Sequence, residues 1–277
     1  MCFQARAGQA WVAFHSRIDA QLDPFGRKVL ERLAPQSGAR VLDVGCGTGQ
    51  TVIQLAELVG PRGEVVGIDV SEPMLECAEE RLHAGGHVQV DLLLDDAQTH
   101  VFLDRYFDLA FSRFGLMFFE DAVAGFSNVC RALRRGGRLG FVCWQSRESN
   151  PWASVPLDAV LGVAPELPPP PFLESDQPGP FFLADPEKIK RILAASGFTS
   201  IDITPMAQPL HFGAASTLSD AVAYGMRLGP ASRVVAEADP KLLPAFGVAL
   251  EAALWPYLGP NGVWLDAAAW VVLAERA

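Results

Sequence analysis

The sequence of 277 residues has little positive charge and no long apolar run. Its 22 Lys and Arg face 32 Asp and Glu, which gives a formal net charge of −10. A surface this acidic repels phosphate backbones, and no dense basic patch offsets the repulsion, so we predict no nucleic-acid partner. No stretch of about 18 uninterrupted apolar residues occurs, and no basic region followed by an apolar run opens the chain. We therefore predict neither a membrane partner nor a secretion signal.

Cysteine is also scarce, and its positions exclude two kinds of scaffold. Cys2, Cys46, Cys77, Cys130 and Cys143 are odd in number, scattered, and contain no CxxC pair. This pattern argues against a disulfide framework and against a structural zinc site. We expect a reduced, cytoplasmic protein.

Apolar residues, by contrast, make up half of the chain and alternate between short runs and helical stretches from Ala39 onward. This alternation is typical of a parallel sheet covered by helices on both faces. The predicted strands are Arg40–Val44, Glu64–Asp69, Val88–Leu94, Phe107–Ser112, Arg138–Trp144 and Thr199–Thr204, with a last strand at Ala267–Leu273.

Capping residues mark the predicted helices between these strands. Ser71, Asp121 and Asp185 each stand where a helix N-cap is expected, and Pro follows two of them closely. Gly136-Gly137 is expected to end the second of these helices and Gly197 the third.

Two segments break the alternation. Residues 150–182 hold nine prolines, so we predict neither a regular helix nor a central strand there. Residues 208–258 predict two helices, Thr217–Leu228 and Pro240–Tyr257, separated by a break at Gly229-Pro230.

These patterns predict one α/β sheet domain with a helical cap. The expected division is an N-terminal helical lid (1–37), an α/β core (38–149, 183–207 and 259–277), a Pro-rich insertion (150–182) and a helical cap insertion (208–258). The cap segment carries an apolar face that needs a partner, which is either the acceptor site or a homodimer interface.

The strongest motif is Val41-Leu42-Asp43-Val44-Gly45-Cys46-Gly47-Thr48-Gly49, in which a strand leads through a glycine-rich turn into a helix. Glycines let a backbone pass close to a ligand, and a helix N-terminus presents free N–H groups. The spacing GxGxG, with Gln50 next, differs from the GxGxxG of dinucleotide sites, and the Lys-Ser/Thr of a Walker loop is absent.

Acidic residues end the next two strands. A carboxylate at Asp69 can accept hydrogen bonds from both hydroxyls of a ribose. At Asp95-Asp96-Ala97, an acidic side chain can bind an adenine amino group, and the following backbone N–H can bind a ring nitrogen. A helix cap or a turn explains any single one of these acids equally well.

Together these motifs resemble class I S-adenosylmethionine-dependent methyltransferases, in the branch that includes the ubiquinone and menaquinone C-methyltransferases and many bacterial small-molecule enzymes. The likeness rests on VLDVGCGTG, VVGIDVSEPML, LDDAQ, FDLAFSRFGLMFF and RALRRGGRLGFVCW, between about Val41 and Trp144. It implies a doubly wound, mostly parallel, Rossmann-like sheet of seven strands whose last strand is antiparallel. It also implies S-adenosyl-L-methionine as cofactor and methyl transfer to O, N or C of a small, partly apolar acceptor.

The resemblance also implies roles for single residues. The glycine turn would hold the methionine moiety, Asp69 the ribose, Asp96 and Ala97 the adenine, and Ser112-Arg113-Phe114 the region near the sulfonium. The predicted cofactor-binding residues are Asp43, Gly45, Cys46, Gly47, Gly49, Asp69, Val70, Met74, Asp96, Ala97, Ser112 and Phe114.

Methyl transfer needs a general base only if the acceptor must lose a proton. His15 and Arg113 are the catalytic candidates: His15 as a base in the lid, Arg113 as a carboxylate-binding group. The competing interpretation of His15 is a half-exposed helix histidine, and that of Arg113 is an ordinary ion pair. His211 is expected to be a loop histidine. An Asp together with a later Asp-Asn would suggest a magnesium site, and the sequence shows no such pair. We therefore predict no metal.

Two other functions stay open at this point. One is a nicotinamide dehydrogenase, which the missing sixth-position glycine disfavours. The other is a pericyclase-like protein that binds the cofactor without transferring its methyl group.

Overall fold

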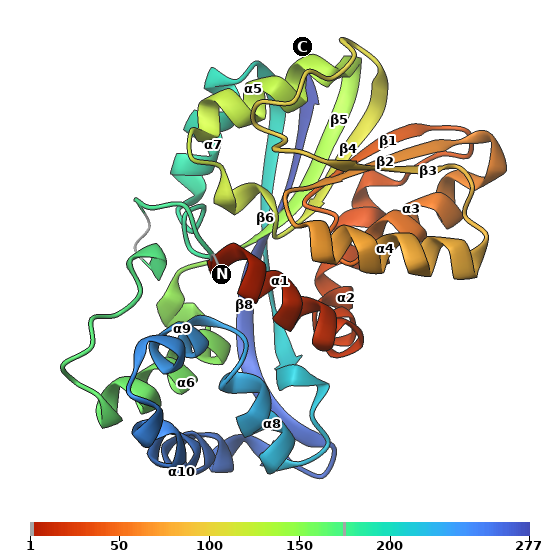
Figure 1. Ribbon diagram of the computed structural model, residues 1–277. Helices are drawn as coiled ribbons and strands as arrows, with labels where there is room; N and C mark the ends of the chain where they lie inside the picture. The colour runs from red at the N-terminus through yellow and green to blue at the C-terminus, as the bar shows by residue number, and fades with distance from the viewer. Residues whose placement is uncertain (1–2, 174–175) are drawn as a thin grey trace.

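The computed structural model describes residues 3–173 and 176–277, which form an α/β sheet with a helical cap at one end (Figure 1). Over these residues, seven strands share one sheet in the order β3-β2-β1-β4-β5-β8-β6, and a short eighth strand, β7, pairs with β8 alone. The strands are β1 (Arg40–Val44), β2 (Glu64–Asp69), β3 (Val90–Leu94), β4 (Phe107–Arg113), β5 (Leu133–Trp144), β6 (Phe198–His211), β7 (Leu258–Gly259) and β8 (Gly262–Arg276).

The sheet is parallel except at β8. Strands β1 to β5 pair in parallel, whereas β8 runs antiparallel to both of its long neighbours, β5 and β6. The Rossmann-like fold class and the antiparallel last strand are therefore confirmed. The strand count is eight rather than seven, because the chain turns back at Gly259–Gly262 and forms the two-residue β7 just before β8.

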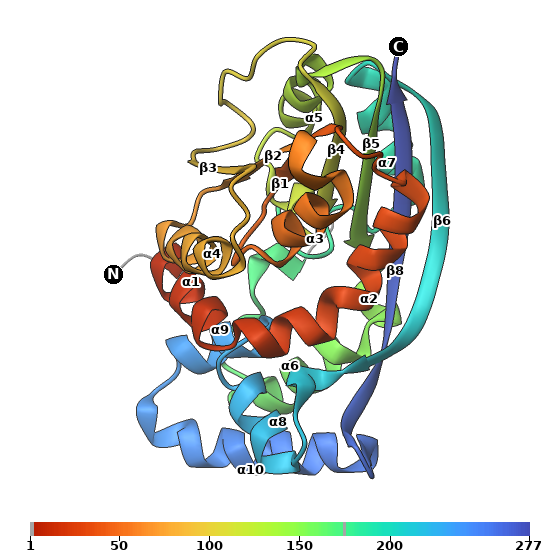
Figure 2. The ribbon, with the colours of Figure 1, turned by 90° about the vertical axis from the view of Figure 1, so that its right-hand side faces the viewer.

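Helices cover both faces of the sheet (Figure 2). On one face lie α2 (His15–Leu33), α3 (Gln50–Val59) and α4 (Glu72–Gly85), and on the other α5 (Ala122–Ala132) and α7 (Pro186–Ala195). The predicted caps at Asp121 and Asp185 are confirmed, since each carboxylate accepts a backbone N–H of its helix. Ser71 is the N-cap of α4, although its hydroxyl makes no capping bond.

The cap gathers where β6 and β8 extend beyond the other strands (Figure 1). It contains α6 (Pro151–Val163), α8 (Leu218–Gly225), α9 (Pro230–Glu237) and α10 (Leu243–Leu254). Helix α6 packs against α9 and α10, and α10 also packs against α8. Helix α1 (Phe3–Ala13) lies between the cap and the sheet domain and packs against α4.

Three sequence predictions were wrong in detail. The expectation of no helix in 150–182 fails at α6, because Pro151 occupies the first turn, where no backbone donor is needed. Pro156 removes one bond inside α6, but burial of Leu157 and Val160 stabilises the helix. The Gly229-Pro230 break is the start of α9, with Gly229 as its N-cap.

The third error concerns the end of α5. This helix stops at Ala132 instead of continuing to Gly136-Gly137, because the chain pairs with β4 already at Leu133. The register between β4 and β5 then shifts, and Gly136, at φ +69°, lies in the irregular stretch.

Over the described ranges, none of the helices has the length and hydropathy to cross a bilayer.

Candidate functional site

The glycine turn after β1 is shaped by three residues in the left-handed region. Gly45, Gly47 and Gly49 have φ of +73°, +57° and +89°. A Cβ at Gly45 would lie 2.9 Å from Gly115 Cα, and one at Gly49 would lie 2.8 Å from Ala78 Cβ, so these two glycines allow close backbone packing. A Cβ at Gly47 would meet only Met74 Cε, the end of a flexible side chain, at 3.0 Å. Of the three glycines, Gly47 is therefore the one beside which the turn leaves room for a ligand.

Asp69, at the end of β2, holds this turn in place. Its Oδ2 accepts the Gly47 N–H at 2.9 Å, and its Oδ1 accepts the Ser71 N–H at 3.0 Å. Each carboxylate oxygen has a second lone pair, so Asp69 can still accept hydroxyl donors from a ligand. Burial raises the pKa of Asp69, and the backbone donors lower it. Its neighbour Val70 is exposed.

Asp43 is fully buried one residue before the end of β1. Thr51 donates its hydroxyl to Oδ2, whereas Oδ1 has no hydrogen-bond partner. Burial raises the pKa of Asp43 to about 7, against the opposing effects of the Thr51 bond and the charge of Arg113. A buried acceptor without a partner costs free energy, and a cationic donor at this place would recover it. Cys46, also buried, has a thiol whose pKa burial raises strongly.

The guanidinium of Arg113 is bound by other side chains of the protein. Its guanidinium is buried, donates to Gln50 Oε1 and lies 3.5 Å from Asp19 Oδ1. Asp19 Oδ2 in turn accepts Arg81 Nη2 at 2.8 Å, and Arg81 Nη1 donates to the Thr48 carbonyl at 2.6 Å. The geometry therefore matches the ion-pair interpretation of Arg113, and its catalytic role stays a prediction.

Asp19 was missed by the sequence analysis, although it connects α2 to the glycine turn through Arg81. A signal was present. Along α2, Asp19 falls in register with the buried residues Gly26, Leu30 and Leu33, so a charged side chain interrupts an otherwise apolar stripe. A carboxylate in such a position is seldom buried without a cationic partner.

Ser112, near the end of β4, and Phe114, directly after it, lie in the same region. The Ser112 hydroxyl donates to the Val44 carbonyl at 2.7 Å and accepts the Gly115 N–H at 3.2 Å, so it ties this loop to the glycine turn. Phe114 adopts φ +60° and stacks on Trp144 with ring centroids 4.0 Å apart. Phe25 of α2 packs edge-on against both rings.

The acidic pair after β3 lies next to Asp69. The Asp95 N–H donates to the Asp69 carbonyl at 3.2 Å, which joins the two strand ends. The Asp95 carboxylate accepts His100 Nδ1–H at 2.7 Å, and this bond lowers the pKa of Asp95. Asp96 is exposed, Ala97 is buried, and Asp96 Oδ1 accepts the Gln98 N–H.

His15, at the start of α2, and His211, the last residue of β6, both have local partners. His15 is half-buried at the start of α2, and its Nδ1 donates to the Val12 carbonyl at 2.9 Å. His211 donates to the Ala215 carbonyl and stacks on Trp264. His211 thus lies at the end of a strand and not in the expected loop, and a proton-transfer role of His15 stays a prediction.

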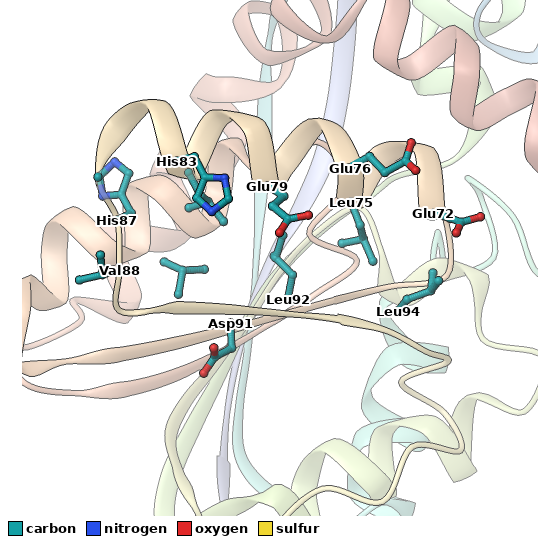
Figure 3. A pocket seen from close by; sticks show the side chains of 13 residues that line it. Glu72, Leu75, Glu76, Glu79, His83, His87, Val88, Asp91, Leu92 and Leu94 are labelled. Carbon is teal, nitrogen blue, oxygen red and sulfur yellow. The ribbon is translucent and has the colours of Figure 1, made fainter.

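A groove of about 590 Å³ lies between α4 and the edge strand β3, beside these strand ends (Figure 3). Leu75 and Leu92 lie inside it, Glu72 and Glu76 stand along the helix, and Asp91 points away from the helix. The glycine turn does not line the groove. In the described ranges, no three His, Cys, Asp or Glu side chains gather in a way that could hold a metal ion.

The strand ends thus bring together an open glycine turn, the buried Asp43, the half-buried Asp69 and the exposed pair Asp95-Asp96. Helix α1 passes over them, and its Gly8 is so close to α4 that a Cβ there would lie 2.5 Å from Ser71 Oγ. This arrangement suits a ligand with a cationic group, hydroxyls and an amino-bearing ring. It offers no nucleophile, and burial raises the pKa of the Cys46 and Cys143 thiols, which keeps them protonated.

Comparisons with known proteins match this sheet domain. Residues 41–137 match a family described as "Methyltransferase domain". An aklanonic acid methyltransferase of Streptomyces sp. (strain C5) is 37% identical over 118 residues, which cover 43% of this chain and 54% of that protein. A demethylmenaquinone methyltransferase of Staphylococcus saprophyticus is 30% identical over 203 residues, 68% of this chain and 83% of that protein.

The chain spans about half the length of the first curated relatives that it matches. Among solved structures, a methyltransferase from Bacillus halodurans superposes with a TM-score of 0.59 at 17% identity, over 90% of this chain and 97% of that one. This likeness concerns the fold.

Proposed function

The chain belongs to the methyltransferase-domain family, and from this premise we propose that it transfers a methyl group from S-adenosyl-L-methionine to O, N or C of a small, partly apolar molecule. By their names, the two relatives above methylate aklanonic acid and demethylmenaquinone, and neither is a nicotinamide dehydrogenase. The single observation that carries the proposal is Asp43 Oδ1, a fully buried acceptor without a partner beside the open glycine turn.

The proposed cofactor contacts follow from the donors and acceptors at the strand ends. Asp43 and the turn from Gly45 to Gly49 would hold the charged methionine end, and Asp69 would accept the ribose hydroxyls. Asp96 and Ala97 would bind the adenine edge. Val70 and Met74 would pack against its rings, and Ser112 and Phe114 would close the floor below the sulfur.

S-adenosylmethionine, when bound, supplies a methyl group on a positively charged sulfur, already activated for displacement. The chain's own task is to align the acceptor atom in line with that bond and to exclude water. The packed rings of Phe114, Trp144 and Phe25 would provide an apolar wall for both purposes. If the acceptor must lose a proton, His15 is the proposed base, and its Nδ1–H bond to Val12 leaves Nε2 as the accepting atom.

The segments outside the sheet domain complete the proposal. Helices α1 and α2 (within residues 1–37, of which 1 and 2 lie outside the described residues), α6 and its loop, and the 208–258 helices would cover the acceptor as lid and cap. The net charge of −10 supports the absence of a nucleic-acid partner. We also propose a cytoplasmic location and association of two copies through the cap helices.

Binding of S-adenosylhomocysteine tests the cofactor site. Asp69→Ala should weaken it at least tenfold by calorimetry, because a lost charge-assisted hydrogen bond contributes about 1.5–3 kcal/mol, and tenfold corresponds to about 1.4 kcal/mol. Asp91→Ala, on the neighbouring strand but pointing away from α4, is the matched control and should bind normally (Figure 3). Unchanged affinity in a folded Asp69→Ala protein would remove Asp69 from the site.

A further inference from the structure

Helix α10 presents an apolar face to solvent on the side away from the cap core. Its buried residues Phe246, Leu250 and Leu254 face the cap, where α10 packs on α6 and α8. On the opposite side, Val248 is 69% exposed, and Trp255, directly after the helix, is 66% exposed. These two residues line a hollow of about 250 Å³ together with Glu251 and Ala252.

The exposed residues of this face recur at heptad spacing. We call them the α10 seam: Lys241, Pro244, Ala245, Val248, Glu251, Ala252 and Trp255, all of them exposed. Lys241 and Trp255 lie in the short 3-10 turns that continue α10 at its two ends. At 100° per residue they fall within an arc of about 120°, and each of the others lies three, four or seven residues from Val248, the pattern of a helix that packs along another helix. The series is also symmetric about Val248, with Lys241 and Trp255 at its two ends.

The charge of the seam favours a second copy of this chain as its occupant. One Lys and one Glu give it no net charge, whereas the whole chain carries −10. Two such acidic molecules repel each other least when they meet through a neutral face. A bilayer is a poorer occupant, because interfacial helices carry several Lys or Arg and this seam has one.

We propose that two copies of the chain pair through the α10 seam, with the two α10 helices antiparallel and a two-fold axis beside Val248. This deepens the association proposed above and rests on it. In a two-fold antiparallel pair, each residue faces the one equally far on the other side of the axis. Val248 then faces the partner's Val248, and Trp255 covers the partner's Lys241 stem and Pro244.

The same geometry pairs the two charged residues of the seam. Lys241 lies about 10 Å from the axis along the helix and the partner's Glu251 about 4–5 Å from it on the same side. The gap of about 6 Å is within reach of a lysine side chain. Within the described part of the chain, neither Lys241 nor Glu251 makes a salt bridge.

Cysteine cross-linking tests the pairing and its direction. In a Cys2→Ser background, Val248→Cys should form a disulfide-linked dimer under mild oxidation, because the two sulfurs meet at the axis. Trp255→Cys alone should not, since its two copies lie about 21 Å apart. A mixture of Lys241→Cys and Trp255→Cys proteins should cross-link. The cysteines Cys46, Cys77, Cys130 and Cys143 are buried and give no background.

Sedimentation measures the association without covalent bonds. Val248→Glu should raise the dimer Kd at least tenfold, and Val88→Glu, at a valine 96% exposed elsewhere, should not. Lys241→Glu and Glu251→Lys should each weaken the dimer, and the double variant should restore it. A monomer at 100 µM, or a dimer that Val248→Glu leaves intact, would overturn the pairing. Because neither readout uses the cofactor, failure here and failure of methyl transfer are distinguishable.

Discussion

Asp43 lies fully buried at the end of β1 with one oxygen bound by Thr51 and the other unpartnered. Its raised pKa of about 7 means that the ligand-free protein holds a proton there over much of the acid range. A raised carboxyl pKa stabilises the fold below the ordinary value near 4. That contribution is lost as the pH rises through about 7.

Binding of a cationic cofactor should reverse this preference. The ligand's positive charge favours ionised Asp43, so binding below pH 7 should release a proton, and affinity should rise by up to tenfold per pH unit before levelling off above pH 7. Calorimetry at pH 6.5 in two buffers of different ionisation heat checks this. Asp43→Asn, which keeps the shape, should bind with the same heat in both buffers. Equal heats for the unaltered protein would contradict the prediction.

At the residue scale, the sequence was informative where a motif imposes a backbone requirement. Gly45, Gly47 and Gly49 were predicted as a turn whose backbone passes close to a ligand, and all three have positive φ in the structure. The sequence could not separate their tasks, because only the packed structure brings Gly115 against Gly45 and Ala78 against Gly49. Asp19 escaped prediction because its partners, Arg81 and Arg113, are 62 and 94 residues away along the chain.

Helices α1 and α2 form the element that would close over the cofactor. Gly8 of α1 packs against Ser71, which directly follows the predicted ribose and adenine contacts at Asp69 and Val70. Asp19 joins α2 to the glycine turn through Arg81. Both links end on segments that the cofactor is proposed to touch, so its binding should stabilise the two helices.

Hydrogen exchange with and without S-adenosylhomocysteine measures this coupling. We expect slower exchange over residues 8–25 in the bound state, in addition to 41–49, 69–74 and 95–98. Gly8→Leu should abolish the effect in α1, because even its Cβ would clash with Ser71 Oγ, whereas Ala13→Leu, at an exposed position, should preserve it. Protection confined to the three strand-end segments would mean that α1 and α2 are not a lid.

Element positions were predictable wherever periodicity and local signals agree. Strands β1 and β2 match their predicted bounds, since buried parallel strands are read as continuous apolar runs. Proline misled the prediction at α6 and α9, where Pro151 and Pro230 stand in the first turn and start the helix. Local sequence could not distinguish these starts from breaks, because tertiary packing of the following residues decides between them.

The molecule as a whole is connected by two long strands. Strands β6 and β8 stay paired from Phe198 and Arg276 at one end to His211 and Trp264 at the other, so they run from the sheet domain into the cap. Helix α6 also packs on β8. The cap therefore shares its backbone hydrogen bonds with the sheet, and we expect the two parts to unfold together although the chain is large for two-state behaviour.

A cavity in the cap core tests this cooperativity. Leu250→Ala removes a fully buried side chain of α10 and should cost about 2–5 kcal/mol. At about 2–4 °C per kcal/mol for a chain of this size class, the single calorimetric transition should move down by roughly 4–20 °C without splitting. Leu243→Ala, at a leucine 40% exposed on the same helix, is the control and should barely shift it. If Leu250→Ala instead produces a separate early transition while the rest of the heat stays in place, the paired strands do not couple cap and sheet, and the cap is an independent folding unit.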